Sequence, residues 1–137
     1  MGRHATEQLV ARTVEVFARD LGMGLFTMTD GRGPDAVAVW RGKRVEFEIK
    51  AARARVTDRS KSGGTRPGRF RIDPSQHESY GTPYLFYVLV SYEDGDEGCE
   101  ITQVRIIRSD YLPRRRAVIS LSAGAVDAVD ADEGEDE

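Results

Sequence analysis

The sequence contains a single cysteine, Cys99, only two histidines, and no apolar run near the roughly 20 residues that a membrane-spanning helix needs. One cysteine excludes an internal disulfide, and thiolate- or histidine-rich zinc sites need more of these residues than the chain contains. Any bound metal is therefore expected to be held by carboxylates, which favour magnesium, manganese or calcium. The N-terminus also lacks an apolar stretch of the signal-peptide type, so the sequence predicts a soluble, cytoplasmic protein without a membrane partner.

Charge is distributed unevenly along the 137 residues. The formal net charge is -3, but seven acids and no bases lie between Asp127 and Glu137, so residues 1–126 carry +4. Residues 41–71 contain eleven lysines or arginines and three acids. So basic a segment suits a phosphate-rich partner such as DNA, although a solvated loop could have the same composition. Residues 123–137 are small and acidic, which predicts a disordered tail that could bind a protein partner.

The hydrophobic pattern predicts one α/β domain over residues 1–122. Residues 4–21 have apolar positions near a 3.6-residue period, as in an amphipathic helix. Asp73 followed by proline is a typical helix start, and a short helix is expected over residues 74–80. The most apolar segment, residues 84–92, is expected to be a central buried strand. Further apolar or alternating runs predict strands at 25–29, 36–40, 44–51, 70–72, 100–107 and 117–121.

Residues 52–69 are rich in arginine, serine and glycine and show no apolar periodicity. This composition predicts a mobile basic loop that orders when a ligand binds. The basic residues in and around this loop are the candidates for nucleic-acid binding. They are Arg53, Arg55, Arg59, Lys61, Arg66, Arg69 and Arg71.

Two acids and a lysine occupy positions that a β-hairpin would bring together. Asp35 precedes the strand expected at 36–40, while Glu48 and Lys50 lie two residues apart on the return strand, so their side chains leave the same face. Two carboxylates on neighbouring strands can hold a divalent metal that keeps bound waters, and the backbone carbonyl of Ile49 can add an oxygen ligand. A lysine beside them can activate a water or stabilise the charge that develops on a phosphate. The set predicts metal-assisted hydrolysis of a phosphodiester.

The Pro-Asp pair that ends at Asp35, followed by the Glu-Ile-Lys run from Glu48 to Lys50, resembles the signature of the PD-(D/E)xK nuclease superfamily. That group includes many restriction endonucleases and archaeal Holliday-junction resolvases. The resemblance covers residues 4–92 and implies a restriction-endonuclease-like α/β core, with a mixed central sheet flanked by helices. It also implies Mg²⁺ or Mn²⁺ as the cofactor, metal ligation by Asp35 and Glu48, and water activation or charge stabilisation by Lys50.

Members of the superfamily often carry another acid in the first helix and a polar residue, frequently glutamine, in the helix after the metal-binding strand. Glu7 is the expected helix acid, with Glu15 as the alternative, and Gln76 fits the second position. In size the chain is nearest to the resolvase-like members. Cutting both strands of a duplex usually implies a homodimer, for which the apolar strands near the C-terminus could form the interface.

Several other residues have a functional interpretation beside a plainer one. Glu46 shares the face of Glu48 but is expected to pair with a base such as Arg44. His77 could be a catalytic base, although a histidine on a helix surface is more often ordinary. The arginines 114–116 could contact phosphate or end a helix, and the sequence favours neither.

Three functions are compatible with these observations. The first is a Mg²⁺-dependent DNA endonuclease, either structure-selective (Holliday junction or flap) in recombination and repair or of the restriction type. The second is a non-catalytic nucleic-acid-binding or accessory module on the same fold, against which the intact set of two acids and a lysine argues. The third is a metal-free subunit that binds a protein partner through its acidic tail.

Overall fold

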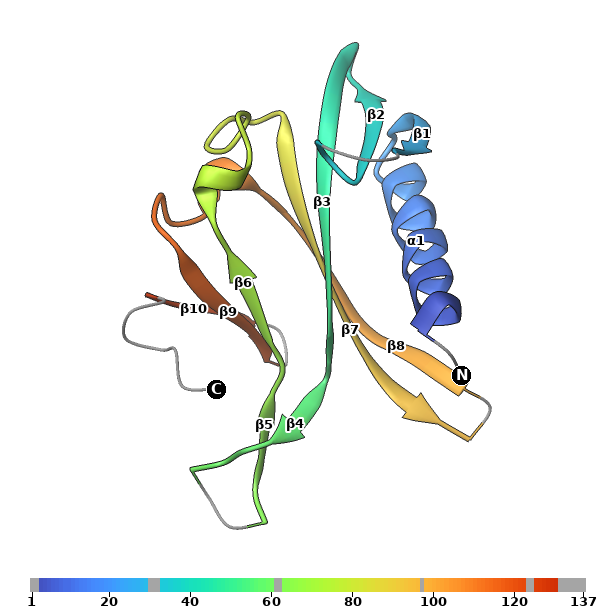
Figure 1. Ribbon diagram of the computed structural model, residues 1–137. Coiled ribbons are helices and arrows are strands. Elements are labelled where there is room, and N and C mark those ends of the chain that lie inside the picture. Colours follow the sequence, from blue (N-terminus) through green and yellow to red (C-terminus); the bar gives the residue numbers. More distant parts are fainter. Residues whose placement is uncertain (1–2, 30–32, 61–62, 97, 123–124, 131–137) are drawn as a thin grey trace.

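The computed structural model describes residues 3–29, 33–60, 63–96, 98–122 and 125–130 (Figure 1). Its one α-helix in these residues, α1 (Arg3–Asp20), packs against one face of a five-stranded sheet. The strands of this sheet are β1 (Gly24–Met28), β2 (Ala36–Trp40), β3 (Lys43–Arg53), β7 (Leu85–Gly95) and β8 (Gly98–Arg108). No helix in the described part of the chain is long and apolar enough to cross a membrane.

The strand order of the large sheet is β1-β2-β3-β7-β8. β3 and β7 run parallel, and every other neighbouring pair is antiparallel, so the sheet is mixed, as expected. A parallel pair needs a long crossover connection. Residues 54–84 provide that crossover, and they contribute β6 (Arg69–Ile72) to a second layer on the face opposite α1.

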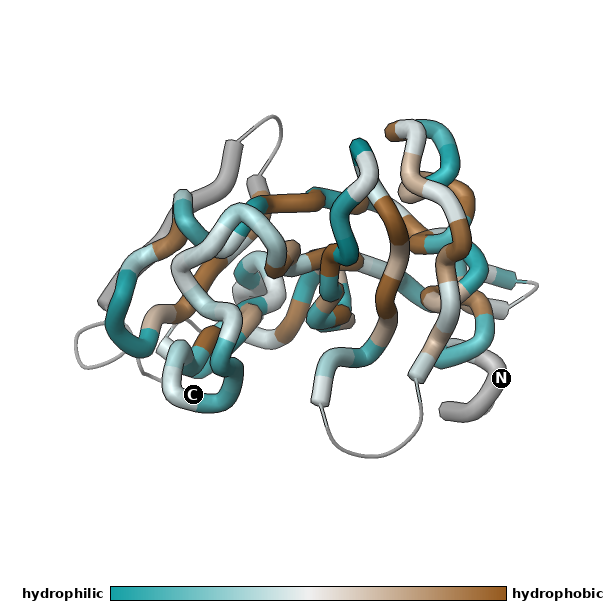
Figure 2. The backbone as a smooth tube through the Cα atoms, turned by 90° about the horizontal axis from the view of Figure 1, so that it is seen from above, coloured by the Kyte–Doolittle hydropathy of each residue, from teal (hydrophilic) through white to brown (hydrophobic). Residues whose placement is uncertain are grey.

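Strand β7 is buried on both of its faces, which explains why its sequence is almost continuously apolar. The side chains of Phe86, Val88 and Val90 pack toward α1 together with residues of β2 and β3. Leu85, Tyr87 and Leu89 pack into a separate core on the opposite face. Figure 2 shows the hydrophobic residues (brown) along the inner strands. The prediction of a central buried strand at 84–92 is confirmed.

A second, three-stranded sheet covers the face opposite α1. Its strands, in the order β10-β9-β6, are β6 (Arg69–Ile72), β9 (Ala117–Ser122) and β10 (Ala125–Asp130). The acidic tail was expected to be disordered from residue 123, and this was wrong for 125–130, which pair with β9 along their whole length. Residues 123–124 and 131–137 lie outside the described part of the chain.

The helix expected over residues 74–80 is only a single 3-10 turn, η1 (Pro74–Gln76). Its predicted cap is present, because the Asp73 carboxylate accepts a hydrogen bond from the Ser75 amide at 3.1 Å. The turn does not continue because the chain soon reaches Gly81, with φ of 84°, and then a proline. In the described residues the second layer is therefore built mainly of strands, and α1 is the helix that flanks the large sheet.

The loop expected over residues 52–69 also contains regular structure. β4 (Arg55–Thr57) and β5 (Thr65–Pro67) pair antiparallel and form a hairpin, here called the basic arm, that projects from one end of β3 (Figure 1). Backbone pairing and hydrogen bonds from the Arg55 side chain to Thr65 hold this short hairpin, so no apolar periodicity predicts it. The arm folds back at Gly68, where the main chain lies very close to Arg53. A Cβ atom added to Gly68 would be 2.0 Å from the carbonyl oxygen of Arg53.

Candidate active site

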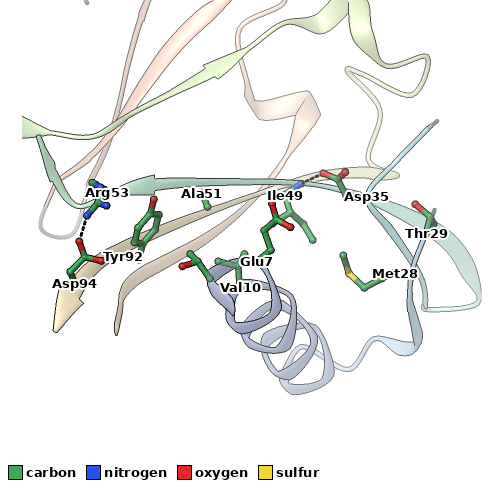
Figure 3. Close-up of a pocket in the computed structure, with 11 residues that line it drawn as sticks. Glu7, Val10, Met28, Thr29, Asp35, Ile49, Ala51, Arg53, Tyr92 and Asp94 are labelled. Atoms are coloured by element: carbon green, nitrogen blue, oxygen red, sulfur yellow. Dashed lines mark hydrogen bonds and ion pairs between the residues drawn. The ribbon is translucent and has the colours of Figure 1, made fainter. Parts of the chain in front are cut away.

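The side chain of Asp35 continues the hydrogen bonding between the β2 and β3 segments. The main-chain amide of Asp35 donates to the Phe47 carbonyl at 2.9 Å, and its main-chain carbonyl accepts a hydrogen bond from the Thr29 amide at 2.9 Å. Its Oδ2 atom then accepts a hydrogen bond from the Ile49 amide at 2.8 Å (Figure 3). Strand β2 begins directly after Asp35, at Ala36. The Asp35 carboxylate also interacts with Glu48, and Asp35 lines a cavity together with Glu7 of α1.

Glu48 and Lys50 leave β3 on one face, and Ile49 packs toward α1 on the other, as the alternation predicted. In the parallel register Glu48 lies beside Tyr87 and Lys50 beside Leu89, so both face the second layer. The Lys50 Nζ atom is 3.8 Å from Glu48 Oε2. The exposed fractions of the two side chains are only 27% for the lysine and 13% for the glutamate. The lysine and the glutamate thus form a pair that is largely shielded from solvent.

The surroundings of Glu48 disfavour its charged form. Burial raises the pKa of Glu48 to about 7, and a hydrogen bond with Asp35 and the charge of that residue act in the same direction. The nearby Lys50 ammonium lowers it in part. In the absence of a cation, two adjacent carboxylates are more stable when they hold a proton between them. A divalent cation would relieve the same repulsion.

The donor set fits a hard divalent metal. Asp35 and Glu48 offer carboxylate oxygens, and the carbonyl of Ile49 points to the same strand edge as the amide that Asp35 binds. In the described part of the chain, no group of three or more His, Cys, Asp or Glu side chains could hold a metal ion. Two carboxylates and a carbonyl suit Mg²⁺, which usually keeps several of its waters and needs only one or two carboxylates.

The structure distinguishes the two candidate acids on the first helix. Glu7 lines a cavity of about 670 Å³ together with Asp35 and Ile49, and Figure 3 shows its side chain directed from α1 toward that strand. Glu15 instead makes an ion pair with Arg19 at 2.8 Å on the surface of the helix. Only Glu7 is therefore placed beside the metal-binding candidates.

Gln76 and its neighbour His77 both lie close to the catalytic candidates. Gln76 lines a cavity of about 220 Å³ that also contains Lys50. His77 is nearer still: its Nε2 atom is 3.4 Å from Glu48 Oε2, and 12% of its side chain is exposed. The geometry of this contact is not that of a hydrogen bond, so the buried Nε2 atom has no hydrogen-bond partner. Burial, followed by the charge of Lys50, lowers the pKa of His77.

The interpretation of His77 as a residue on a helix surface was wrong. The helix ends before it, at Gln76, and the ring packs edge-on against Tyr87 with a centroid distance of 5.8 Å. No local pattern distinguishes this histidine, because the contact depends on how the second layer packs on β7. Glu46, by contrast, forms the expected ion pair with Arg44, at 2.5 Å.

The proposed nucleic-acid-binding residues fall into separate groups. Arg59, Arg66 and Arg69 line a cavity of about 470 Å³ on the basic arm. Arg71 lies farther along β6, in the cavity that contains Lys50. Of the other residues in the set, Arg53 pairs with Asp94 and stacks on Tyr92, and Arg55 bonds to Thr65. Lys61 lies outside the described part of the chain.

A mixed five-stranded sheet with a helix on one face, and a pair of acids and a lysine where β2 and β3 meet, defines a restriction-endonuclease-like α/β domain. The chain belongs to the PD-(D/E)XK nuclease superfamily, because the model of that superfamily domain matches residues 3–121. Members are generally nucleases that use divalent metals. The predicted resemblance is thus confirmed and extends well beyond residue 92. No curated protein and no solved structure gives a significant match.

Proposed function

We propose that the protein is a metal-dependent endodeoxyribonuclease that hydrolyses phosphodiester bonds. The observation that carries this proposal is the pair of adjacent carboxylates, Asp35 and Glu48, with the ammonium group of Lys50 3.8 Å from Glu48. A purely structural ion pair between Lys50 and Glu48 would not need Asp35, a second acid that raises the pKa of Glu48. Membership of a nuclease superfamily supports the same conclusion.

Each residue has a defined role in this proposal. Asp35 and Glu48, with the Ile49 carbonyl, would hold Mg²⁺ or Mn²⁺. When bound, the metal would act as a Lewis acid toward the phosphate and lower the pKa of a coordinated water. Lys50 orients the attacking water and donates to the phosphate oxygens as their negative charge grows. The hydrogen bond from the Ile49 amide keeps the Asp35 carboxylate aligned throughout.

The basic arm supplies a contact surface for the DNA backbone. The arginines that line its cavity, Arg59, Arg66 and Arg69, come from both sides of the hairpin and from the strand that follows it. Guanidinium groups suit phosphate because their planar fork can donate two parallel hydrogen bonds. Such contacts hold DNA without reading its sequence.

A structure-selective role at Holliday junctions or flaps, in recombination or repair, suits this chain better than site-specific restriction. Reading a sequence requires elements that enter a groove and contact base edges. The described residues form one compact domain and a short arm, whose arginines suit the DNA backbone. A homodimer would supply the second active site that cutting two strands requires.

Cleavage of a substrate panel tests the proposal. The panel contains linear duplex, single strand, flap and four-way junction, each with Mg²⁺ or Mn²⁺. We expect metal-dependent cutting by the wild type and its loss in both Glu48→Ala and Lys50→Ala. Glu46→Ala is the matched control, because Glu46 lies on the same strand and face but pairs with Arg44.

The alternative results lead to different functions. Salt-sensitive binding without cutting of any substrate would indicate a non-catalytic DNA-binding module. No binding to any substrate would refute a nucleic-acid function altogether. Removal of the residues after Asp130 should leave cutting unchanged and abolish only the binding of a protein partner.

A further inference from the structure

A basic groove leads outward from Lys50 on the face that carries Glu48. Its inner part is the cavity of about 220 Å³ that contains Lys50, Arg71, Gln76 and Arg116. Its outer part, of about 410 Å³, lies between η1 and the connection from β8 to β9. Asp73 and Arg116 line both parts, so the two cavities adjoin. We call the whole the exit groove.

Bases from three distant segments converge on the exit groove. Lys50 comes from β3, Arg71 from β6, and the arginines 114–116 from the β8–β9 connection. Among the described residues that line it, the one acid is Asp73, which accepts hydrogen bonds from the amide and hydroxyl of Ser75 and interacts with the charge of Arg116. The groove therefore has a large excess of positive charge, and its inner end opens at the catalytic lysine.

The fold excludes the plainer interpretation of the arginines 114–116. A run of bases can end a helix, where it interacts with the carboxyl end of the helix dipole. The helical turn that precedes them in the chain, η2 (Ser109–Tyr111), ends before Leu112, and the arginines lie in an irregular segment that leads into β9. The run of bases therefore does not form the end of a helix.

We propose that the exit groove binds the sugar–phosphate backbone of one DNA strand beside the bond that is cut. Arg71 and Arg116 contact the phosphate next to the one at Lys50, and the arginines 114–115 contact the phosphates that follow. Residues of η1, which line the exit groove, lie at one end of β6, and the basic arm lies at the other end (Figure 1). The strand would thus pass from the arm, across Lys50, and into the groove. This inference rests on the proposed nuclease function and adds the path of the substrate.

The test removes two charges from the inner part of the groove. Arg71→Gln and Arg116→Gln, combined in one protein, keep side-chain length and polarity. Arg114 is left in place because its guanidinium packs over the main chain of Gly81. Arg12→Gln is the matched control, since Arg12 is exposed on α1, on the other side of the large sheet.

Binding of a single-stranded oligonucleotide is measured over a series of salt concentrations without divalent metal. The slope of log K against log salt is negative, and each lost phosphate contact makes it shallower by about 0.7. The slope of the double variant should therefore be about 1.4 shallower than that of the wild type. Arg12→Gln should match the wild type. In cleavage assays the double variant should show a raised KM and an unchanged kcat, because it retains the catalytic residues. Thermal unfolding verifies that all variants are folded.

The outcomes separate the groove from the proposed function. A double variant with the slope and KM of Arg12→Gln would overturn the exit groove, while cutting by the wild type would leave the nuclease function standing. A fall in kcat without a change in slope would also overturn it, because the arginines would then act on the catalytic residues and not on the backbone. A wild type that neither binds nor cuts DNA would overturn both.

Discussion

Replacing Glu48 with glutamine should make the metal-free protein more stable at pH 8, although Glu48 belongs to the candidate active site. The wild-type side chain is 13% exposed and forms a hydrogen bond with Asp35, so its ionisation in the folded chain is unfavourable. Glutamine has nearly the same shape and carries no charge. The substitution therefore removes the repulsion and keeps the packing.

The size of the effect follows from the pKa of Glu48, which rises from 4.5 to about 7 on folding. One pKa unit corresponds to about 1.4 kcal/mol, which sets an upper limit of about 3 kcal/mol. Screening by solvent at the open side of the site reduces the expected gain to about 1–2 kcal/mol.

The sign depends on pH. Below pH 4.5 Glu48 is protonated in the folded and unfolded chains, and glutamine gives no advantage. Between pH 4.5 and 7 the unfolded chain loses this proton while the folded chain keeps it, so the wild type loses stability as the pH rises. Above pH 7 the difference reaches its full value.

Urea denaturation from pH 4.5 to pH 8.5, in buffer with a chelator, measures the free energy of unfolding of both proteins. Glu46→Gln is the control, because Glu46 is paired with Arg44 and should gain nothing from neutralisation. Addition of Mg²⁺ at pH 8 should then reverse the order, since only the wild type retains both carboxylates and gains stability from binding. Equal stabilities at pH 8, or a difference that does not vary with pH, would refute the inferred burial of Glu48 beside Asp35.

Three further predictions concern neighbouring residues. Lys50→Ala should raise the pKa of Glu48 further, because the ammonium group lowers it in the wild type; an NMR titration of the carboxyl carbon measures this, and an unchanged value would place the lysine elsewhere. His77→Ala should lower the free energy of unfolding by about 1–3 kcal/mol in urea denaturation, because it removes a buried ring, whereas an ordinary surface residue would change it very little. Gly68→Ala should destabilise the protein by about 2 kcal/mol or more, because the added Cβ clashes with a main-chain oxygen of β3. Gly24→Ala, which meets no atom within 4 Å, is its control, and equal melting temperatures would contradict the clash.

Local pattern in the sequence determined the large sheet and the central residues of the site. The alternation along β3 assigned Ile49 to one face and Glu48 and Lys50 to the other, because successive side chains of a strand point in opposite directions. The unbroken apolar run of β7 indicated a strand that is buried on both faces. Both inferences needed only neighbouring residues, and both are confirmed by the structure.

The second layer was decided by tertiary structure. The sequence predicted a helix at 74–80, a loop at 52–69 and disorder beyond 123, where the structure has a single turn and short strands. Strands β4, β5 and β10 are held by backbone pairing with segments that local composition does not reveal. Short elements of this kind contain too few residues for a periodic pattern to develop.

The environment of the site likewise depends on contacts between distant segments. His77 lies against Glu48 because η1 packs over β3 and β7, and Arg116 shares a cavity with Lys50 because β9 pairs with β6. Sequence alone thus predicted which residues are the candidates for binding a metal and activating a water. The tertiary structure decided how far Glu48 is desolvated and which bases lie around it, because burial and charge proximity are properties of packing and not of local pattern.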